Sequence, residues 1–157
     1  MKKKAIGVCV IIIGLSLMSG CSKKTLPDLP SDAVAFEVGS FVDQGNDAAS
    51  FITIEYNGRT YIQFGTRNNK YKQSCVDSCV GYLVQNEHLS SVVDLSNTNW
   101  RIYTLSVDHE HNFLMDFDDS VELMNQPVFW RAVDTNGKDI EIPDYIDSFS
   151  DAFWGEQ

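Results

Sequence analysis

The chain has 157 residues, of which 43% are hydrophobic and 11% aromatic, and its 22 acidic and 12 basic residues give a formal charge of −10 at pH 7. This apolar content supports a folded core and excludes a disordered chain. The length allows one ordinary domain. The acidic balance makes nucleic acid and anionic lipid headgroups poor partners for such a surface.

The first 21 residues have the pattern of an export signal. Three lysines follow the first methionine, an apolar run covers 5–18, and small residues precede Cys21. The apolar run is short for a membrane span. The segment Met18-Ser19-Gly20-Cys21 resembles the lipobox of bacterial lipoproteins. That resemblance implies cleavage of 1–20 as a signal peptide, a diacylglyceryl thioether on Cys21 and acylation of the new amino terminus.

An acylated Cys21 makes membrane lipid the expected partner at this end of the chain. Two or more acyl chains give a stable anchor, so the domain is expected to work outside the cytoplasm at a bilayer surface. In a cell with two membranes the resemblance favours the outer one, because Ser22 is not the aspartate associated with inner-membrane retention. An ordinary secretory signal and a retained amino-terminal span remain alternatives, and the ordinary signal leaves the cysteine unexplained.

The segment 21–32 is expected to be a flexible tether. It contains two prolines, is mostly polar and has no hydrophobic period, a composition typical of spacers. A single domain is expected over 33–157. Without the three lysines of the leader, nine basic residues face 22 acidic ones, which gives the mature chain a formal charge of −13.

The hydrophobic pattern predicts a mainly β domain with little helix. Strands are expected at 33–42, 51–56, 59–64, 79–84, 100–105, 112–117 and 128–133. Asn57-Gly58, between the second and third of them, is a strong hairpin signal. Seven short strands separated by turn residues favour a single antiparallel β-sandwich or partly open barrel. Helix is expected only at 89–95 and after Pro143, where Ile146, Phe149 and Phe153 have helical spacing.

Four of the seven basic residues in 33–157 lie in one stretch that has no acidic residue. These four are Arg59, Arg67, Lys70 and Lys72. Such a stretch either pairs with the acidic carboxyl-terminal third and with solvent, or presents a contact patch to a partner.

Cys75 and Cys79 are the cysteines left once Cys9 leaves with the signal and Cys21 is acylated. A turn between them would bring both within bridging reach, and disulfides persist outside the cytoplasm. A short-loop disulfide is therefore expected. A thiol redox centre and a zinc site completed by two of the three histidines, His88, His109 and His111, are the alternatives.

Asp108, His109 and His111 are the candidate metal ligands. On a strand the two imidazoles would share a face and could hold a divalent metal together with the carboxylate. The segment also reads as a polar hairpin turn between two strands, which requires no metal. The chain contains no G-x-S-x-G elbow, phosphate-binding glycine loop or H-E-x-x-H motif, so no catalytic residue and no cofactor is predicted.

Trp130 and Arg131 form the second candidate contact, since arginine beside aromatic residues is typical of binding hot spots. Half-buried strand positions are the alternative for both. The sequence thus favours a non-enzymatic domain that binds an envelope protein or another macromolecule. The expected contact is either the loop 67–79, with Arg67, Lys70 and Lys72, or the strand that carries Trp130 and Arg131. The alternatives are an acidic inhibitor or immunity-type lipoprotein that covers a basic protein, and a small metal-dependent hydrolase that uses His109 and His111.

Overall fold

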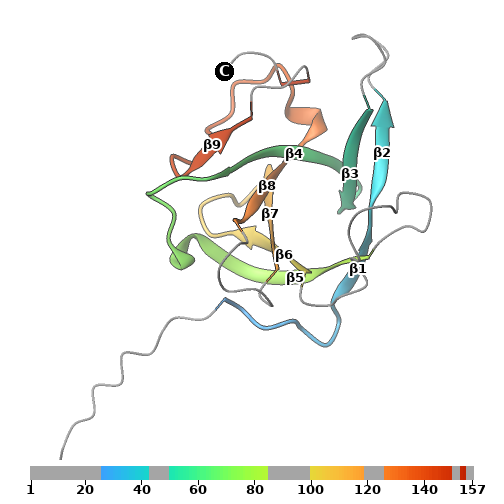
Figure 1. Ribbon diagram of the computed structural model, residues 1–157, viewed down its shortest axis with the longest axis vertical. Coiled ribbons are helices and arrows are strands. Elements are labelled where there is room, and N and C mark those ends of the chain that lie inside the picture. The colour runs from blue at the N-terminus through green and yellow to red at the C-terminus, as the bar shows by residue number, and fades with distance from the viewer. Residues whose placement is uncertain (1–25, 43–49, 85–99, 119–125, 150–152, 155–157) are drawn as a thin grey trace, which may run out of the picture.

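The structure is a computed structural model that describes residues 26–42, 50–84, 100–118, 126–149 and 153–154 (Figure 1). These residues form nine strands: β1 (Val34–Glu37), β2 (Gly39–Val42), β3 (Ser50–Tyr56), β4 (Arg59–Arg67), β5 (Val76–Val84), β6 (Trp100–Leu105), β7 (Phe113–Asp118), β8 (Val128–Ala132) and β9 (Ile146–Ser148). Two 3-10 turns, η1 (Gln73–Cys75) and η2 (Val133–Thr135), complete the described elements. None of the described segments is a helix with the length and hydropathy to cross a bilayer.

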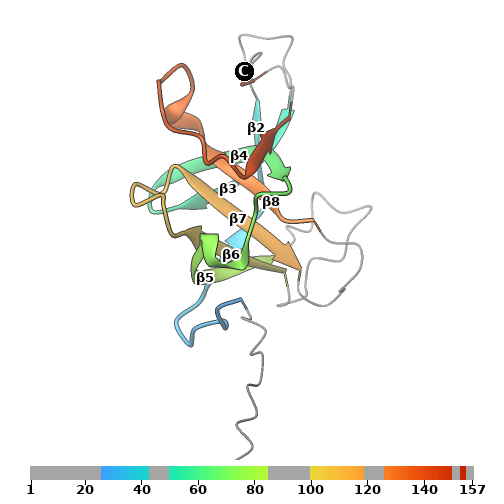
Figure 2. The same cartoon turned by 90° about the vertical axis from the view of Figure 1, so that its left-hand side faces the viewer.

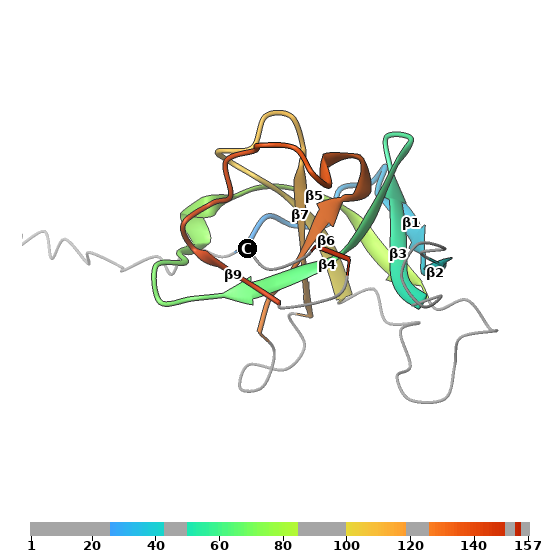
Figure 3. The ribbon, with the colours of Figure 1, turned by 90° about the horizontal axis from the view of Figure 1, so that it is seen from above.

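All nine strands belong to one sheet that curls into a nearly closed barrel with an unsealed seam (Figures 1 and 3). The order is β1-β5-β6-β7-β8-β4-β3-β2, with β9 added to β4. The two ends of this order, β1 and β2, follow one another in the chain and are separated by Val38. The continuous segment 34–42 therefore pairs with two strands. Its β1 part pairs with β5 in parallel, and its β2 part pairs with β3 in antiparallel orientation. The predicted mainly antiparallel, partly open barrel is confirmed.

The β3–β4 hairpin forms where the sequence predicts it. Asn57 and Gly58 both have positive φ angles, 50° and 74°, which is the conformation that two-residue hairpin turns of this type require. Tyr56 and Arg59 pair directly across the turn. The hairpin thus places Arg59 at the first position of β4.

The predicted helix after Pro143 is wrong, because Ile146–Ser148 forms β9 against the second half of β4. β3 pairs only with the first half of β4, so the edge of β4 that faces β3 is free for another strand beyond Ile62. A Cβ atom at Gly65 would collide with the carbonyl oxygen of Asp147, so the absence of a side chain permits the close approach. The other helix predicted, 89–95, lies outside the described residues.

The β6, β7 and β8 strands are buried on both faces, so apolar residues occur on both faces of each strand and do not alternate with exposed polar ones. One face packs into a first core together with side chains of β1, β3, β4 and β5, which lie inside the curl of the sheet. The residues of this core are Phe36, Val38, Ile54, Tyr61, Leu83, Ile102, Leu114, Trp130 and Ala132.

The other face packs into a second core that segments outside the barrel complete. Among these segments are the aromatic residues Tyr71, Tyr145 and Trp154 and the leucines Leu26 and Leu29. Both leucines fall within the stretch 21–32, which the sequence predicts to be a tether. The described part of that stretch lies against the domain.

Asp116 is a buried carboxylic acid on the first-core face of β7, with 3% of its surface exposed. Its Oδ2 accepts a hydrogen bond of 2.7 Å from the Trp130 indole nitrogen. Burial raises the pKa of Asp116 to about 7, while hydrogen bonds from Trp130 and from the Val128 backbone act in the opposite direction. A carboxyl group in this position keeps its proton well above the pH at which an exposed aspartate loses it.

Stability should therefore fall as pH rises from about 4 to about 7. In this window the folded protein keeps the Asp116 proton that the unfolded chain releases, so the free energy of unfolding decreases with pH. A difference of about three pKa units corresponds to about 4 kcal/mol. In the Asp116→Asn variant, the free energy of unfolding should not show this decrease with pH. Urea unfolding of both proteins across the window measures it, and parallel curves would contradict the assignment.

Gly81→Ala should destabilise the barrel by about 1–3 kcal/mol, the usual range for overpacking. A Cβ atom at Gly81 would collide with the Val34 carbonyl oxygen and lie 2.6 Å from Cε2 of Phe36, which would separate β1 from β5. Ser78→Ala, at an exposed position of the same strand, is the control and should change stability little. Urea unfolding of the two variants makes the comparison; equal stabilities would contradict a close β1–β5 contact.

Candidate functional site

A groove of about 520 Å³ lies between the β6–β7 loop and the stretch 139–143. Figures 2 and 3 show the β6–β7 loop and the segment after β8 on the same side of the molecule. Of the described residues that line the groove, four carry carboxylates and one, His109, can carry a positive charge. The lining residues are Val107, Asp108, His109, Glu110, Asn112, Asp139, Ile140, Glu141 and Pro143, which we call the acidic groove.

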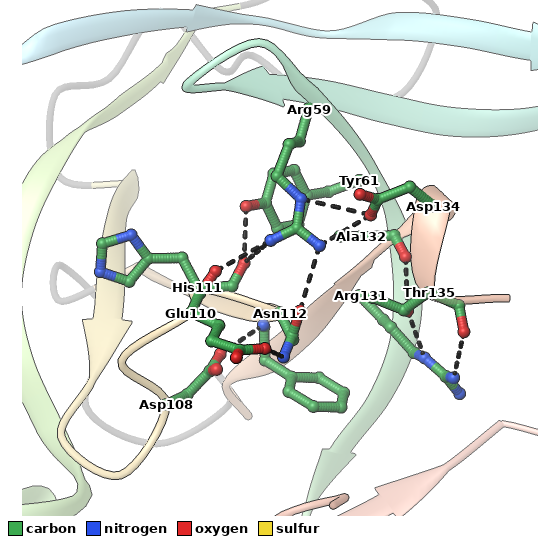
Figure 4. Close-up of polar contacts among 11 residues, drawn as sticks. Arg59, Tyr61, Asp108, Glu110, His111, Asn112, Arg131, Ala132, Asp134 and Thr135 are labelled. Carbon is green, nitrogen blue, oxygen red and sulfur yellow. Dashed lines mark hydrogen bonds and ion pairs between the residues drawn. The ribbon is translucent and has the colours of Figure 1, made fainter. Parts of the chain in front are cut away.

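Arg59 holds the loop that forms one wall of the acidic groove (Figure 4). Its Nη1 donates to the carbonyl oxygens of Glu110 and His111, at 2.9 and 3.0 Å. Its Nη2 donates to Oδ1 of Asn112 at 3.1 Å and to Oδ1 of Asp134 at 2.7 Å. One guanidinium therefore joins the start of β4 to the β6–β7 loop and to η2, which a single lysine amine could not do with the same geometry.

The charges of this contact support each other. Burial opposes the charge of Arg59, but Asp134, Tyr61 and Asp108 together outweigh it, and the pKa of Arg59 is raised. In return, the hydrogen bond from Arg59 lowers the pKa of the Asp134 carboxyl. The ion pair is partly exposed, at 24% for the arginine and 56% for the aspartate side chain, so its strength comes chiefly from the number of hydrogen bonds to the arginine.

Tyr61 fixes the same loop from inside the barrel. Its hydroxyl donates a 2.7 Å hydrogen bond to the carbonyl oxygen of His111, and burial raises the pKa of Tyr61 to about 12. His111 has a positive φ angle of 53°, a conformation that non-glycine residues adopt rarely and that surrounding contacts must hold. The bonds from Tyr61 and Arg59 to one carbonyl group supply those contacts.

The predicted metal ligands are not brought together. His109 and Asp108 line the acidic groove, whereas the ring of His111 lies against Tyr56 with a centroid distance of 5.8 Å. Asp108 also accepts a 2.6 Å hydrogen bond from the Phe113 backbone nitrogen. Among the described residues, no three His, Cys, Asp or Glu side chains are grouped so that they could hold a metal ion. The polar hairpin turn, the alternative reading of this segment, agrees with its position between β6 and β7.

The basic stretch divides between internal pairing and a second groove. Arg59 is paired as described, and Lys70 lies 3.3 Å from the Asp144 carboxylate in an exposed ion pair. Arg67 and Lys72 line a groove of about 290 Å³, and neither forms an ion pair with another described residue. The guanidinium of Arg67 lies 5.9 Å from the centre of the Tyr71 ring. Internal pairing thus applies to Arg59 and Lys70, whereas Arg67 and Lys72 stay candidates for a contact patch.

Trp130 and Arg131 are not available for contact, which corrects the second candidate surface. They are 1% and 2% exposed. Arg131 lies between the rings of Phe64 and Trp154, 5.2 and 4.7 Å from their centroids, and donates hydrogen bonds to Thr135. Both residues belong to β8, where two apolar faces require burial, so the aromatic and arginine pair stabilises the cores.

The predicted disulfide between Cys75 and Cys79 is not formed. Cys75 ends η1, and β5 begins immediately afterwards at Val76. An extended chain separates residues four apart by about 13 Å, whereas bridged Cα atoms lie within about 7 Å. Pairing of Val76 and Cys79 with β6 replaces the turn that a bridge needs. His88, one of the three histidines considered with these cysteines for zinc, lies outside the described residues.

The sequence did not single out Asp139 and Glu141, which complete the acidic groove, or the role of Arg59 beneath it. The sequence held one signal for these two acids, because they flank Ile140 directly after a turn. Comparisons with protein-family models, curated proteins and solved structures found no match. The chemistry of the groove follows from its lining: carboxylates beside the apolar residues Val107, Ile140 and Pro143 favour a ligand with positive charges on aliphatic stems.

Arg59→Gln should lower the free energy of unfolding by about 2 kcal/mol, because charge-assisted hydrogen bonds to three segments are lost. Backbone amides of 108–112 should exchange with solvent faster. Lys70→Gln, which removes the same charge from an exposed ion pair, should change stability by less than about 1 kcal/mol. Hydrogen exchange and thermal unfolding of the two variants make the comparison; equal effects would mean that Arg59 does not organise the loop.

Proposed function

We propose that this chain is a lipoprotein anchored outside the cytoplasm by acylated Cys21, and that its domain is a non-enzymatic module that binds a cationic partner. The export leader and the lipobox-like segment Met18-Ser19-Gly20-Cys21 support the anchor. The anchoring membrane is the cell membrane, or the outer membrane in a cell that has two. Membrane lipid is then the partner of Cys21, and a protein of the envelope is the partner of the domain.

The acidic groove is the observation that carries the binding proposal. Asp139 and Glu141 stand on one side of it, and Asp108 and Glu110 on the other. Val107, which is 64% exposed, and Ile140 offer apolar surface to the methylene stems of lysine or arginine. A basic segment of an envelope protein fits both properties of the groove.

An inhibitor or immunity-type role is the second candidate, and the charge of the chain favours it. A formal charge of −13 on the mature chain would speed the encounter with a basic protein that acts at the envelope. The same groove would then cover a basic surface of that protein. No observation favours the metal-dependent hydrolase, since His109 and His111 face different surroundings.

The double variant Asp139→Asn/Glu141→Gln should weaken binding of a lysine-rich peptide roughly fivefold at low salt, because two exposed charges that face the ligand are lost. Fluorescence anisotropy measures the affinity. An acetyl-lysine version of the peptide should bind weakly to every protein, and added salt should reduce the difference between the variants.

The double variant Asp32→Asn/Glu37→Gln is the matched control, since both acids are exposed, neither lines the groove, and the net charge changes equally. Equal weakening by the two double variants would reduce the effect to net charge and contradict a specific groove.

In the parent cell, crosslinking should recover the partner with the native protein. Cys21→Ser should leave the membrane fraction, and full retention would contradict the anchor.

A further inference from the structure

The second groove differs in charge from the rest of this acidic chain. Two cations, Arg67 and Lys72, line it, together with Gln73 and with the apolar or aromatic residues Leu26, Tyr71, Phe117 and Pro127. None of the described residues that line it is acidic. We call this the basic groove. Guanidinium, ammonium and amide donors beside apolar carbon match a phosphate group that is attached to an aliphatic chain.

The position of Leu26 places the basic groove next to the lipid-attachment residue. Leu26 is half-buried against the second core and also lines the groove. Figure 1 shows the first described residues beside the turn that precedes β5. Five peptide units separate Leu26 from Cys21, and even a fully extended chain of that length spans only about 18 Å. An acyl group on Cys21 therefore keeps the groove within that distance of the bilayer surface.

We propose that the basic groove binds the phosphate headgroup of an anionic phospholipid in the membrane that holds the anchor, an inference that rests on the proposed acylation of Cys21. Arg67 offers a planar pair of donors to the phosphate, and Lys72 adds a point charge. Phe117, Pro127 and Leu26 contact the glycerol and the first methylene groups. The contact holds the domain in one orientation on the bilayer.

The rest of the charge distribution strengthens this choice of orientation. An acidic domain is repelled by an anionic membrane as a whole, so the surface that can approach the headgroups is one rich in cations, as the described lining of the basic groove is. Lys23 and Lys24 follow Cys21 closely in the sequence and add positive charge beside the anchor. Basic residues near an anionic bilayer each contribute about fivefold in binding, and the contribution falls off within a Debye length.

The test uses the full chain, purified from membranes and reconstituted into vesicles of phosphatidylcholine alone or of phosphatidylcholine with phosphatidylglycerol. Hydrogen exchange of the 67–73 backbone should slow in the anionic vesicles only. Lys72→Gln should reduce that protection about fivefold, and Arg67→Gln/Lys72→Gln should abolish it. Lys138→Gln, which removes one charge at an exposed position outside the groove, is the matched control and should keep the protection.

Each result separates the inference from the proposed anchor. Mass spectrometry of the same sample reports acylation of Cys21, and an unmodified cysteine would overturn the proposed function. An acylated protein whose 67–73 amides exchange equally in both vesicles would overturn the headgroup site alone. Inorganic phosphate, added to the phosphatidylcholine vesicles, should give no protection. Protection by phosphate there would assign the groove to a soluble anion and overturn the lipid as its ligand.

Discussion

Burial of both faces of the β6, β7 and β8 strands is the constraint on which the rest of the structure depends. The curl of the sheet covers one face with β1 and β3, but a sheet that curls toward one side leaves the other face open. Segments outside the barrel cover that face: the chain around Leu26, the Tyr71 turn and the stretch that leads to Tyr145. Their apolar contacts replace the second sheet of a sandwich.

The two grooves result from this covering arrangement. The stretch 139–143 carries Ile140 and Ile142 against the second core, and its acidic residues then face the β6–β7 loop. The amino-terminal chain packs on the same core, which places Leu26 beside Arg67 and Lys72. Exposed residues of opposite charge thus occupy segments whose positions are set by apolar residues a few positions away.

Local signals were sufficient to predict the strands and the hairpin. Asn57-Gly58 requires positive φ angles, and short apolar runs bounded by turn residues have few alternatives to a strand. The hydrophobic pattern could not reveal which segments of the chain cover each face of the sheet. In β6 to β8, apolar residues occur on both faces of the strands, in agreement with two buried faces. Trp130 and Arg131 are therefore buried, although in the sequence they resemble a binding hot spot.

The errors concern contacts between residues distant in sequence. Ile146, Phe149 and Phe153 fit a helical period, but the open edge of β4 decides that Ile146 joins a strand. The Cys75 and Cys79 spacing permits a bridge only if the chain turns, and pairing with β6 extends it. Arg59 shows the same limit, since its partners lie about 50 and 75 residues away. Contacts between residues so far apart in the chain cannot be predicted from a single sequence.

The separation of the two grooves explains how one small domain can present both charges. They lie at opposite ends of β7, since Asn112 lines the acidic groove and Phe117 the basic one. Six residues of strand separate the ends by roughly 17 Å, about twice the Debye length at physiological ionic strength. The carboxylates of one groove therefore do little to neutralise Arg67 and Lys72 in the other. Each groove keeps its own electrostatic preference, and a ligand bound in one leaves the charge of the other available.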